Sequence, residues 1–457
     1  MSSADVMAWF WSRQQAHQFV IEQIPFAEME QWGFEPDTGN LVHDSGKFFS
    51  IEGLHVRTNF GSRAEWKQPV INQPEVGILG IITKKFNGIL HFLMQVKMEP
   101  GNINMVQLSP TLQATRSNFT CVHKGRKPPY LDYFLERGKH RVLVDSLQSE
   151  QGGRFLKKRN RNIIIEVEED VPALPDYGWL TLGQIQQLMA MDNLVNMDSR
   201  TVIGCIPFAG SPEEAEALSD PFRRMVLNSV LLEDNSLHCM DDLISWFTEQ
   251  RVQYELDVKS IPLNAVDEWG KTADEIRHRE NDYFSVIACR VKAGSREVVS
   301  WTQPLIKTPE PGIAALITRP INGVLHFLIQ AKVEPGNFDV AEMAPSVQCT
   351  TGNYRRVRKD RRPPFLTTVL DAPADQIRFD VHLSEEGGRF YQEANRNLII
   401  EVGEDFSVEV PDNYTWMTLR QIKEFIKYNN FLNVECRCLV SCLGFLEPME
   451  ETLATRS

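Results

Sequence analysis

The sequence predicts an α+β fold in which one domain occurs twice in tandem. The segments "NGILHFLMQVKMEPGN" (87–102) and "NGVLHFLIQAKVEPGN" (322–337) agree at 12 of 16 positions, 235 residues apart. In the same way, "NRNIIIEV" (160–167) matches "NRNLIIEV" (395–402). A period this long that occurs only twice indicates a duplicated domain rather than a solenoid. We therefore expect a first repeat (1–206), a connector rich in proline and acidic residues (207–240) and a second repeat (241–457).

Each repeat is expected to contain a mixed sheet flanked by helices. The runs "VGILGIIT" (76–83) and "GILHFLMQVK" (88–97) are rich in β-forming residues and predict a hairpin that turns near Gly88. Thr181 and Thr418 are each followed three residues later by a glutamine. That spacing is typical of a capping box, so helices are predicted over about 182–191 and 419–428. Two strands cannot enclose a core, so further elements must complete each sheet.

The composition disfavours several classes of protein. Apolar residues make up 42% and charged residues 24%, as in globular proteins, and no apolar run approaches the roughly 18 residues of a membrane span. The N-terminus lacks a basic segment followed by an apolar one, so no secretory signal is expected. A formal net charge of −13 disfavours nucleic acid as the main partner.

The eight cysteines are scattered, and only "CRCLVSC" (436–442) has the close spacing of a metal site. This segment lacks a second pair of ligands at zinc spacing, and its apolar residues suggest a strand. We expect buried free thiols, no bound metal and a reducing compartment, most simply the cytoplasm.

Polar residues recur on one face of the predicted strand 89–99. Because side chains alternate along a strand, Leu90, Phe92, Met94, Val96 and Met98 form an apolar face. The other face carries His91, Gln95, Lys97 and Glu99 together with apolar residues, and the second repeat has the same polar residues. A solvated sheet face would also alternate in this way. Retention of the same residue types in both copies favours the lining of a pocket.

A basic segment follows in each repeat. Six arginines and lysines fall within 355–362, in a chain that is acidic overall. A charge run is often only a solvated loop. Here "SEQGGRF" (149–155) and "SEEGGRF" (384–390) add paired glycines beside Arg154 and Arg389, which favours a small polyanion such as a diphosphate. Trp66 and Trp301 precede Gln-Pro in apparent loops, where an indole could stack on a nucleotide base or simply pack in the core.

Several catalytic motifs are absent from the sequence. It contains no G-x-G-x-x-G at the start of a βαβ unit, no Walker loop, no G-x-S-x-G and no H-E-x-x-H. Hydride transfer on a dinucleotide, ATP chemistry and serine hydrolysis are therefore disfavoured, and no cofactor is expected.

With these motifs together, the chain resembles the NDP-hexose 2,3-dehydratases of deoxysugar biosynthesis. The residues that carry the resemblance are "HFLMQVKMEPGN", "VQLSPTLQATRSN", "SEQGGRF" and "NRN", with their counterparts in the second repeat. The resemblance implies two tandem Nudix-like domains, a homodimer and a nucleotide-sugar pocket in each half. It implies a dTDP-linked 4-keto-6-deoxyhexose as substrate and a 3-ketoreductase that acts next. The glutamate-rich helix of Nudix hydrolases is absent from both halves, so pyrophosphate hydrolysis is not expected.

The implied reaction needs a base, an acid and hydrogen-bond donors toward an enediolate, but no redox cofactor. The titratable candidates are Glu99, His91, Lys97, Glu150 and Tyr130, and spacing alone does not assign their roles. Substrate contacts are expected from polar and glycine residues of the repeated motifs: Trp66, Trp301, Gln95, Gln113, Thr115, Arg116, Asn118, Ser149, Gln151, Gly152, Gly153, Arg154, Asn160, Asn162, Arg355, Arg389 and Asn395.

The first repeat is the better candidate for catalysis. It has Tyr130 where the second has Phe365, and the second has a denser run of arginines, which do not exchange protons usefully near neutral pH. Two alternatives remain at this stage. One is a nucleotide-sugar pyrophosphohydrolase on the same fold, and the other is a binding protein without catalytic activity.

Overall fold

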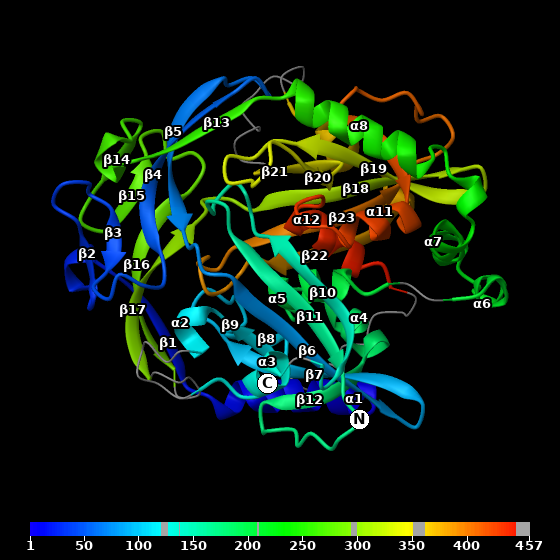
Figure 1. The fold of residues 1–457 in the computed structure, drawn as a ribbon, viewed down its shortest axis with the longest axis horizontal. Helices are drawn as coiled ribbons and strands as arrows, with labels where there is room; N and C mark the ends of the chain where they lie inside the picture. The colour runs from blue at the N-terminus through cyan, green and yellow to red at the C-terminus, as the bar shows by residue number, and fades with distance from the viewer. Residues whose placement is uncertain (120–126, 137, 208–209, 294–298, 351–361, 445–457) are drawn as a thin grey trace.

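The structure is a computed structural model that describes residues 1–119, 127–136, 138–207, 210–293, 299–350 and 362–444. In these ranges the strands form two large sheets of seven strands and two small sheets of five. Figure 1 shows the small sheets at the left and the large sheets one above the other at the right. The predicted α+β class and the tandem duplication are confirmed.

The first large sheet is built from the first repeat. Its strands run in the order β10, β11, β6, β7, β12, with β9 beside β6 and β8 beside β7. Only β11 and β6 are parallel among the described neighbours, so the sheet is mixed, as predicted. The hairpin between β6 and β7 turns at Asn87 and Gly88, whose positive φ angles of 51° and 82° suit a tight turn. The bounds are β6 (Gly77–Phe86), β7 (Ile89–Met98), β8 (Val106–Ser109), β9 (Leu112–Ala114), β10 (Arg141–Ser149), β11 (Arg159–Glu166) and β12 (Tyr177–Thr181).

The second large sheet repeats this topology with residues of the second repeat. Its order is β22, β23, β18, β19, β24, with β21 beside β18 and β20 beside β19. The bounds are β18 (Gly312–Ile321), β19 (Val324–Lys332), β20 (Glu342–Pro345), β21 (Val347–Thr350), β22 (Ile377–Ser384), β23 (Ala394–Glu401) and β24 (Tyr414–Thr418).

The small sheets exchange strands between the repeats. Strand β1 (Phe19–Ile24) of the first repeat pairs with β16 (Ser285–Ala293) of the second, and β13 (Leu256–Ile261) pairs with β4 (Ser50–Thr58) of the first. Each small sheet therefore contains backbone from both repeats. The remaining members of one are β14 (Trp269–Lys271), β15 (Glu275–His278) and β17 (Ser300–Lys307); those of the other are β2 (Trp32–Phe34), β3 (Leu41–His43) and β5 (Glu65–Asn72).

Both predicted capping boxes are confirmed. Thr181 and Gln184 begin α4 (Leu182–Met189), and Thr418 and Gln421 begin α11 (Leu419–Ile426). Each threonine hydroxyl accepts the N–H of its glutamine, and each glutamine side chain accepts the N–H of its threonine. The other α-helices of the described residues are α1 (Ser3–Ala16), α2 (Arg116–Phe119), α3 (Leu131–Leu135), α5 (Met197–Gly204), α6 (Pro212–Ala217), α7 (Pro221–Leu231), α8 (Met240–Gln253), α10 (Leu366–Leu370) and α12 (Val434–Ser441).

The strand expected at "CRCLVSC" is wrong, because this segment lies in α12. Asn433 caps the helix by accepting the N–H of Cys436, and α12 packs against α5 of the first repeat. A side chain at Gly204 of α5 would lie 2.5 Å from the Arg437 carbonyl, so glycine allows the two helices to approach closely. Among the described cysteines, all are free thiols; Cys289, Cys436, Cys438 and Cys442 are buried as predicted, whereas Cys239 is exposed. Among the residues that the structure describes, no helix is long and apolar enough to cross a membrane.

Candidate active site

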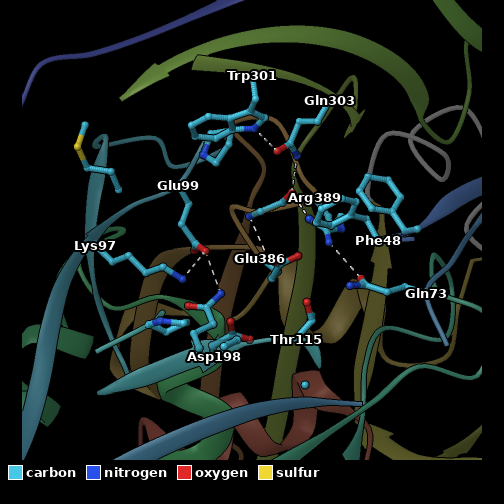
Figure 2. Close-up of a pocket in the computed structure, with 18 of the residues that line it drawn as sticks. Phe48, Gln73, Lys97, Glu99, Thr115, Asp198, Trp301, Gln303, Glu386 and Arg389 are labelled. Atoms are coloured by element: carbon cyan, nitrogen blue, oxygen red, sulfur yellow. Dashed lines mark hydrogen bonds and ion pairs between the residues drawn. The ribbon is translucent and has the colours of Figure 1, made fainter. Parts of the chain in front are cut away.

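A cavity of about 640 Å³ opens beside the first large sheet and is lined by both repeats (Figure 2). Strands β6, β7 and β9 of the first repeat form one wall. The second repeat contributes residues 300–303 of β17. It also contributes the loop between β22 and β23, through Glu386, Gly388 and Arg389. Strand exchange and this loop therefore make one cavity from two parts of the chain far apart in sequence.

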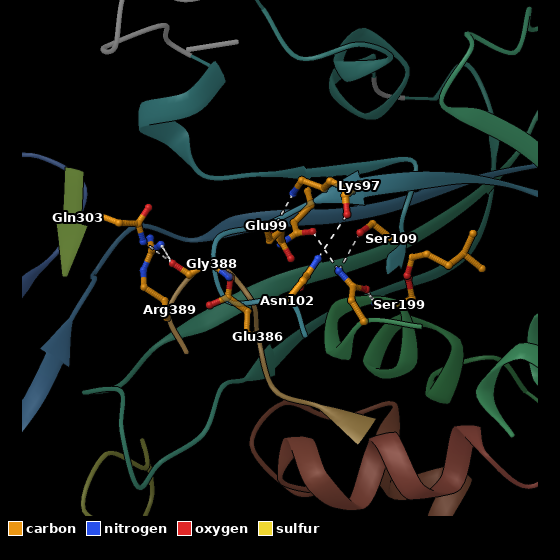
Figure 3. A network of polar contacts seen from close by, with 12 residues as sticks. Lys97, Glu99, Asn102, Ser109, Ser199, Gln303, Glu386, Gly388 and Arg389 are labelled. Carbon is orange, nitrogen blue, oxygen red and sulfur yellow. Dashed lines mark hydrogen bonds and ion pairs between the residues drawn. The ribbon is translucent and has the colours of Figure 1, made fainter. Parts of the chain in front are cut away.

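Lys97 and Glu99 lie at the end of β7, and both are buried. Lys97 Nζ lies 3.2 Å from Glu99 Oε1, and Gln113 Nε2 donates to the same oxygen at 2.9 Å. Asn102 donates to the Lys97 carbonyl at 3.4 Å, which fixes the bend after the strand (Figure 3). Two donors on one carboxylate oxygen are the arrangement that stabilises an ionised carboxylate.

A second buried acid, Glu150, directly follows β10 and contacts Asn160 of β11. Asn160 Nδ2 donates to Glu150 Oε1 at 2.6 Å, while Asn160 Oδ1 accepts the N–H of Gly77 at 3.1 Å. Burial raises the pKa of Glu150, and Lys158 opposes this shift. Burial also lowers the pKa of Lys158 to about 8.

Asp198 and Glu386 complete a group of four carboxyl groups around the cavity. Asp198 stands in the first turn of α5 and is buried. Burial raises its pKa well above the usual value, and nearby Glu386, Glu150 and Glu99 add to the shift. Burial likewise raises the pKa of Glu386 to about 7, and Glu99 and Glu150 add to it, whereas Arg389 and Lys97 oppose it. A carboxyl group with a raised pKa is better suited to proton transfer near neutral pH than an ordinary one.

The opposite side of the cavity carries a cation and an indole. The Arg389 guanidinium lies 4.1 Å from the Phe49 ring centre, and Arg389 Nη2 donates to Gln73 Oε1 at 3.2 Å. Trp301 Nε1 donates to Gln303 Oε1 at 2.8 Å, and Gln303 Nε2 donates to the Gly388 carbonyl at 2.8 Å. These contacts fix a planar cation, which suits phosphate oxygens, next to an aromatic face, which suits a base.

The sequence matches the family described as NDP-hexose 2,3-dehydratase over residues 3–206 and again over residues 240–443. The chain belongs to this family. The resemblance in the repeated motifs is thus confirmed over both halves of this dehydratase-family chain.

Its relatives cover nearly the whole chain. A protein of Saccharopolyspora spinosa named dTDP-4-dehydro-6-deoxy-alpha-D-glucopyranose 2,3-dehydratase is 50% identical over 443 residues, which are 96% of this chain and 90% of the relative. A protein of Amycolatopsis orientalis with the same name is 46% identical over 97% of this chain and 90% of its own length. A third, from Streptomyces violaceoruber, is 44% identical over 97% of both chains.

The cavity of this family member brings together many of the predicted site residues. From the candidate acids, bases and cations these are Glu99, Lys97 and Glu150. From the predicted substrate contacts they are Gln95, Gln113, Thr115, Asn160, Trp301 and Arg389. Gln95, Lys97 and Glu99 lie on the polar face of β7, so this part of the face lines a pocket, as predicted.

Two predicted catalytic residues, His91 and Tyr130, are not among the residues that line the cavity. His91 is at the other end of β7, where Nδ1 lies 2.9 Å from the Ile89 carbonyl and the ring packs edge-on against Phe86. The Tyr130 hydroxyl donates to the Pro172 carbonyl at 2.7 Å, and its ring packs against Tyr177. Each side chain therefore has a structural contact, and that of Tyr130 is to Tyr177, which lines the cavity.

The Gly-Gly-Arg loop of each repeat packs against the other repeat. The loop of the first repeat therefore lies beside Glu334 of the second. The predicted residues Ser149, Gln151, Gly152, Gly153 and Arg154, with Trp66 and Asn395, surround a matching group at Lys332 and Glu334 rather than the cavity. Arg154 lies 4.3 Å over Phe284, as Arg389 does over Phe49. Trp66 and Trp301 lie on strands β5 and β17, so the expected loops are wrong.

Two of the remaining predicted contacts, Asn162 and Arg116, are not among the residues that line the cavity. Asn162 is buried on β11, where its Nδ2 donates to Thr201 Oγ1 of α5 at 3.2 Å. Arg116 is exposed on the short helix α2 and is not among the lining residues. The Asn118 side chain, Arg355 and most of the basic segments lie outside the described residues.

Sequence reasoning missed Asp198, Glu386, Lys158, Gln73 and Gln303. A comparison of the two repeats would have indicated two of them, Glu386 and Lys158. Glu386 aligns with Gln151, and Lys158 aligns with Glu393, so the two repeats differ in charge where the cavity is charged. Asp198 corresponds to Glu435 and gave no such contrast, because both are acids.

Proposed function

We propose that the chain is a carbon–oxygen lyase that eliminates water from dTDP-4-dehydro-6-deoxy-D-glucose and yields a 3,4-diketo-2,6-dideoxy sugar. The observation that carries the proposal is the cavity of the first repeat, where four carboxyl groups face an arginine and a tryptophan. Family membership and three relatives with this named activity support the substrate.

The reaction begins at C3 of the sugar. The C4 ketone acidifies the C3 proton, a carboxylate removes it, and the electrons form an enediolate across C3 and C4. Glu99 suits this step because Lys97 and Gln113 both contact one of its oxygens and stabilise the ionised form. The enediolate then reforms the C4 carbonyl, expels the C2 hydroxyl as water with a proton from an acid, and leaves a C2–C3 enol.

The enol becomes the product by moving protons only. C2 gains a proton, the C3 hydroxyl loses one, and C3 becomes a ketone. No electron leaves or enters the substrate, so the residues of the cavity supply every step as acids, bases and hydrogen-bond donors. Lys158, whose pKa burial lowers to about 8, is placed to balance negative charge beside Glu150.

The other end of the cavity suits the nucleotide. The Arg389 guanidinium presents a fixed fork for diphosphate oxygens. The Trp301 indole, held by Gln303, offers a face for the thymine. In this arrangement the second repeat binds the nucleotide of a sugar that reacts on the first repeat.

The proposal extends to the setting of the reaction. A 3,4-diketo sugar is reactive, so a 3-ketoreductase must consume it soon after release. We expect the chain to work as a homodimer in a reducing cytoplasm, in keeping with its free thiols.

The test is incubation with dTDP-4-dehydro-6-deoxyglucose and a trapping 3-ketoreductase, followed by mass spectrometry of the sugar. We expect loss of one water and of the C2 hydroxyl. Release of dTMP would instead support a pyrophosphohydrolase, and saturable binding without any change in the sugar would support a binding protein. Neither alternative has a specific observation in its favour.

A further inference from the structure

Glu386 lines the cavity as a carboxylic acid, whereas the aligned residue of the first repeat, Gln151, is an amide. Glu386 comes from the second repeat but lies beside Glu99 of the first (Figures 2 and 3). The loop that carries it is fixed by two backbone hydrogen bonds: Gly101 N–H to the Gly387 carbonyl at 2.7 Å, and Gln392 N–H to the Gly101 carbonyl at 2.8 Å. Its position therefore depends on backbone contacts with the end of β7, not on flexible side chains.

The glycines explain how closely the loop approaches. A side chain at Gly387 would lie 2.1 Å from Asn102 Oδ1 and 3.0 Å from Glu99 Cβ. A side chain at Gly101 would lie 1.5 Å from the Phe390 carbonyl oxygen. Neither position can accept a larger residue without moving the loop, so Gly101 and Gly387 together allow Glu386 to lie next to Glu99.

The Glu386 carboxyl group has one contact within its own loop, where Oε1 accepts the N–H of Gly388 at 3.1 Å. Buried acids surround it, and its pKa is raised to about 7 chiefly by burial. Near neutral pH the group therefore exists in both protonation states. Glu99, by contrast, contacts Lys97 and Gln113, as a carboxylate base would. Two neighbouring carboxyl groups with different surroundings are a recurring way to obtain one acid and one base.

The matching group of the second repeat retains the binding residues but not this acid. Lys332 lies 3.2 Å from Glu334, Gln348 donates to Glu334 at 3.3 Å, and Trp66 Nε1 donates to Gln68 at 2.8 Å. At the place of Glu386 stands Gln151, whose amide donates to Glu385. An amide cannot deliver a proton as a carboxylic acid does.

We propose that Glu386 is a catalytic residue that protonates the C2 hydroxyl as it leaves, and that Gln151 denies this step to the second repeat. The inference rests on the proposed function. Glu99 takes the C3 proton, the C2–O bond breaks, and the Glu386 proton completes the departing water. As the enol relaxes, Glu386 takes the C3 hydroxyl proton and Glu99 returns a proton to C2, which restores both groups.

The test compares Glu386→Gln with the wild-type chain on two substrates. The substitution is nearly isosteric, and the fold already accepts glutamine at the matching position. With the natural substrate we expect turnover to fall by about 10²-fold or more. With the 2-deoxy-2-fluoro analogue we expect a loss of only a few-fold, because fluoride leaves without a proton.

A second measurement separates the acid role from a structural one. In D₂O, Glu386→Gln should still exchange the C3 proton of the natural substrate, since Glu99 performs that step, and it should bind dTDP within a few-fold of wild type. Equal losses on both substrates, or loss of C3 exchange, would overturn the assignment, as would full turnover of the natural substrate. If the wild-type chain itself leaves the natural substrate unchanged, the proposed function fails instead.

Discussion

The paired substitutions Glu99→Gln and Glu334→Gln test which repeat carries out the chemistry. Glu99 follows β7, and Glu334 follows the corresponding strand β19. Lys97 Nζ lies 3.2 Å from Glu99, and Lys332 Nζ lies 3.2 Å from Glu334. Gln113 donates to Glu99 at 2.9 Å, and Gln348 donates to Glu334 at 3.3 Å. Each substitution removes a carboxyl group from a similar setting, buried for Glu99 and partly buried for Glu334, so each should lower the free energy of unfolding by a similar amount, about 1–3 kcal/mol.

The catalytic effects should differ sharply. Loss of a general base typically lowers turnover by about 10²- to 10⁴-fold, which corresponds to about 3–5 kcal/mol in the activation barrier. We expect this loss for Glu99→Gln and at most a few-fold change for Glu334→Gln. The assay measures turnover with the trapping reductase in excess, and thermal unfolding of both variants provides the matched control. Equal losses of turnover, or a larger loss in Glu334→Gln, would refute the assignment to the first repeat.

Three further predictions concern the nucleotide, metals and pH. Saturating dTDP should raise the melting temperature more than UDP or GDP does, because a ligand that binds only the folded state stabilises it; equal shifts would argue against recognition of thymine. Dialysis against EDTA should leave turnover unchanged, and a loss that magnesium restores would favour hydrolase chemistry. Burial raises the pKa of Glu342 to about 7, so its contribution to stability is present below the unfolded value near 4.5 and is lost as the pH rises through 7. Glu342→Gln should therefore gain melting temperature relative to wild type between pH 5 and pH 8, and a constant difference would contradict this.

Local patterns in the sequence predicted the parts of the fold that depend on short-range physics. The period of two placed Gln95, Lys97 and Glu99 on one face of β7, because alternation follows from strand geometry. The capping boxes located α4 and α11 for a similar reason, since the side-chain and backbone partners are three residues apart. His91 shares that face but does not line the cavity, because eight residues of strand separate it from Glu99 by about 26 Å.

The exchange of strands and loops between repeats was not predictable from the sequence. Each copy carries the same pairing partners, so the pattern does not say whether β1 joins β4 or β16. For the same reason Arg154 and Arg389 looked equivalent, although only Arg389 reaches the cavity of the first repeat. Segment 436–442 was misread because an apolar run of this length suits a buried helix as well as a strand.

We expect one cavity, formed by both repeats, to hold the substrate with its nucleotide on the second repeat and its reacting carbons on the first. A crystal structure of Glu99→Gln with the bound dTDP-4-keto-6-deoxy sugar would test this arrangement. We predict the diphosphate on Arg389, the thymine on Trp301, and C3 and C2 within about 3.5 Å of residues 99 and 386. A sugar in which C2 and C3 point away from both residues, or one found only beside Lys332 and Glu334, would contradict the account.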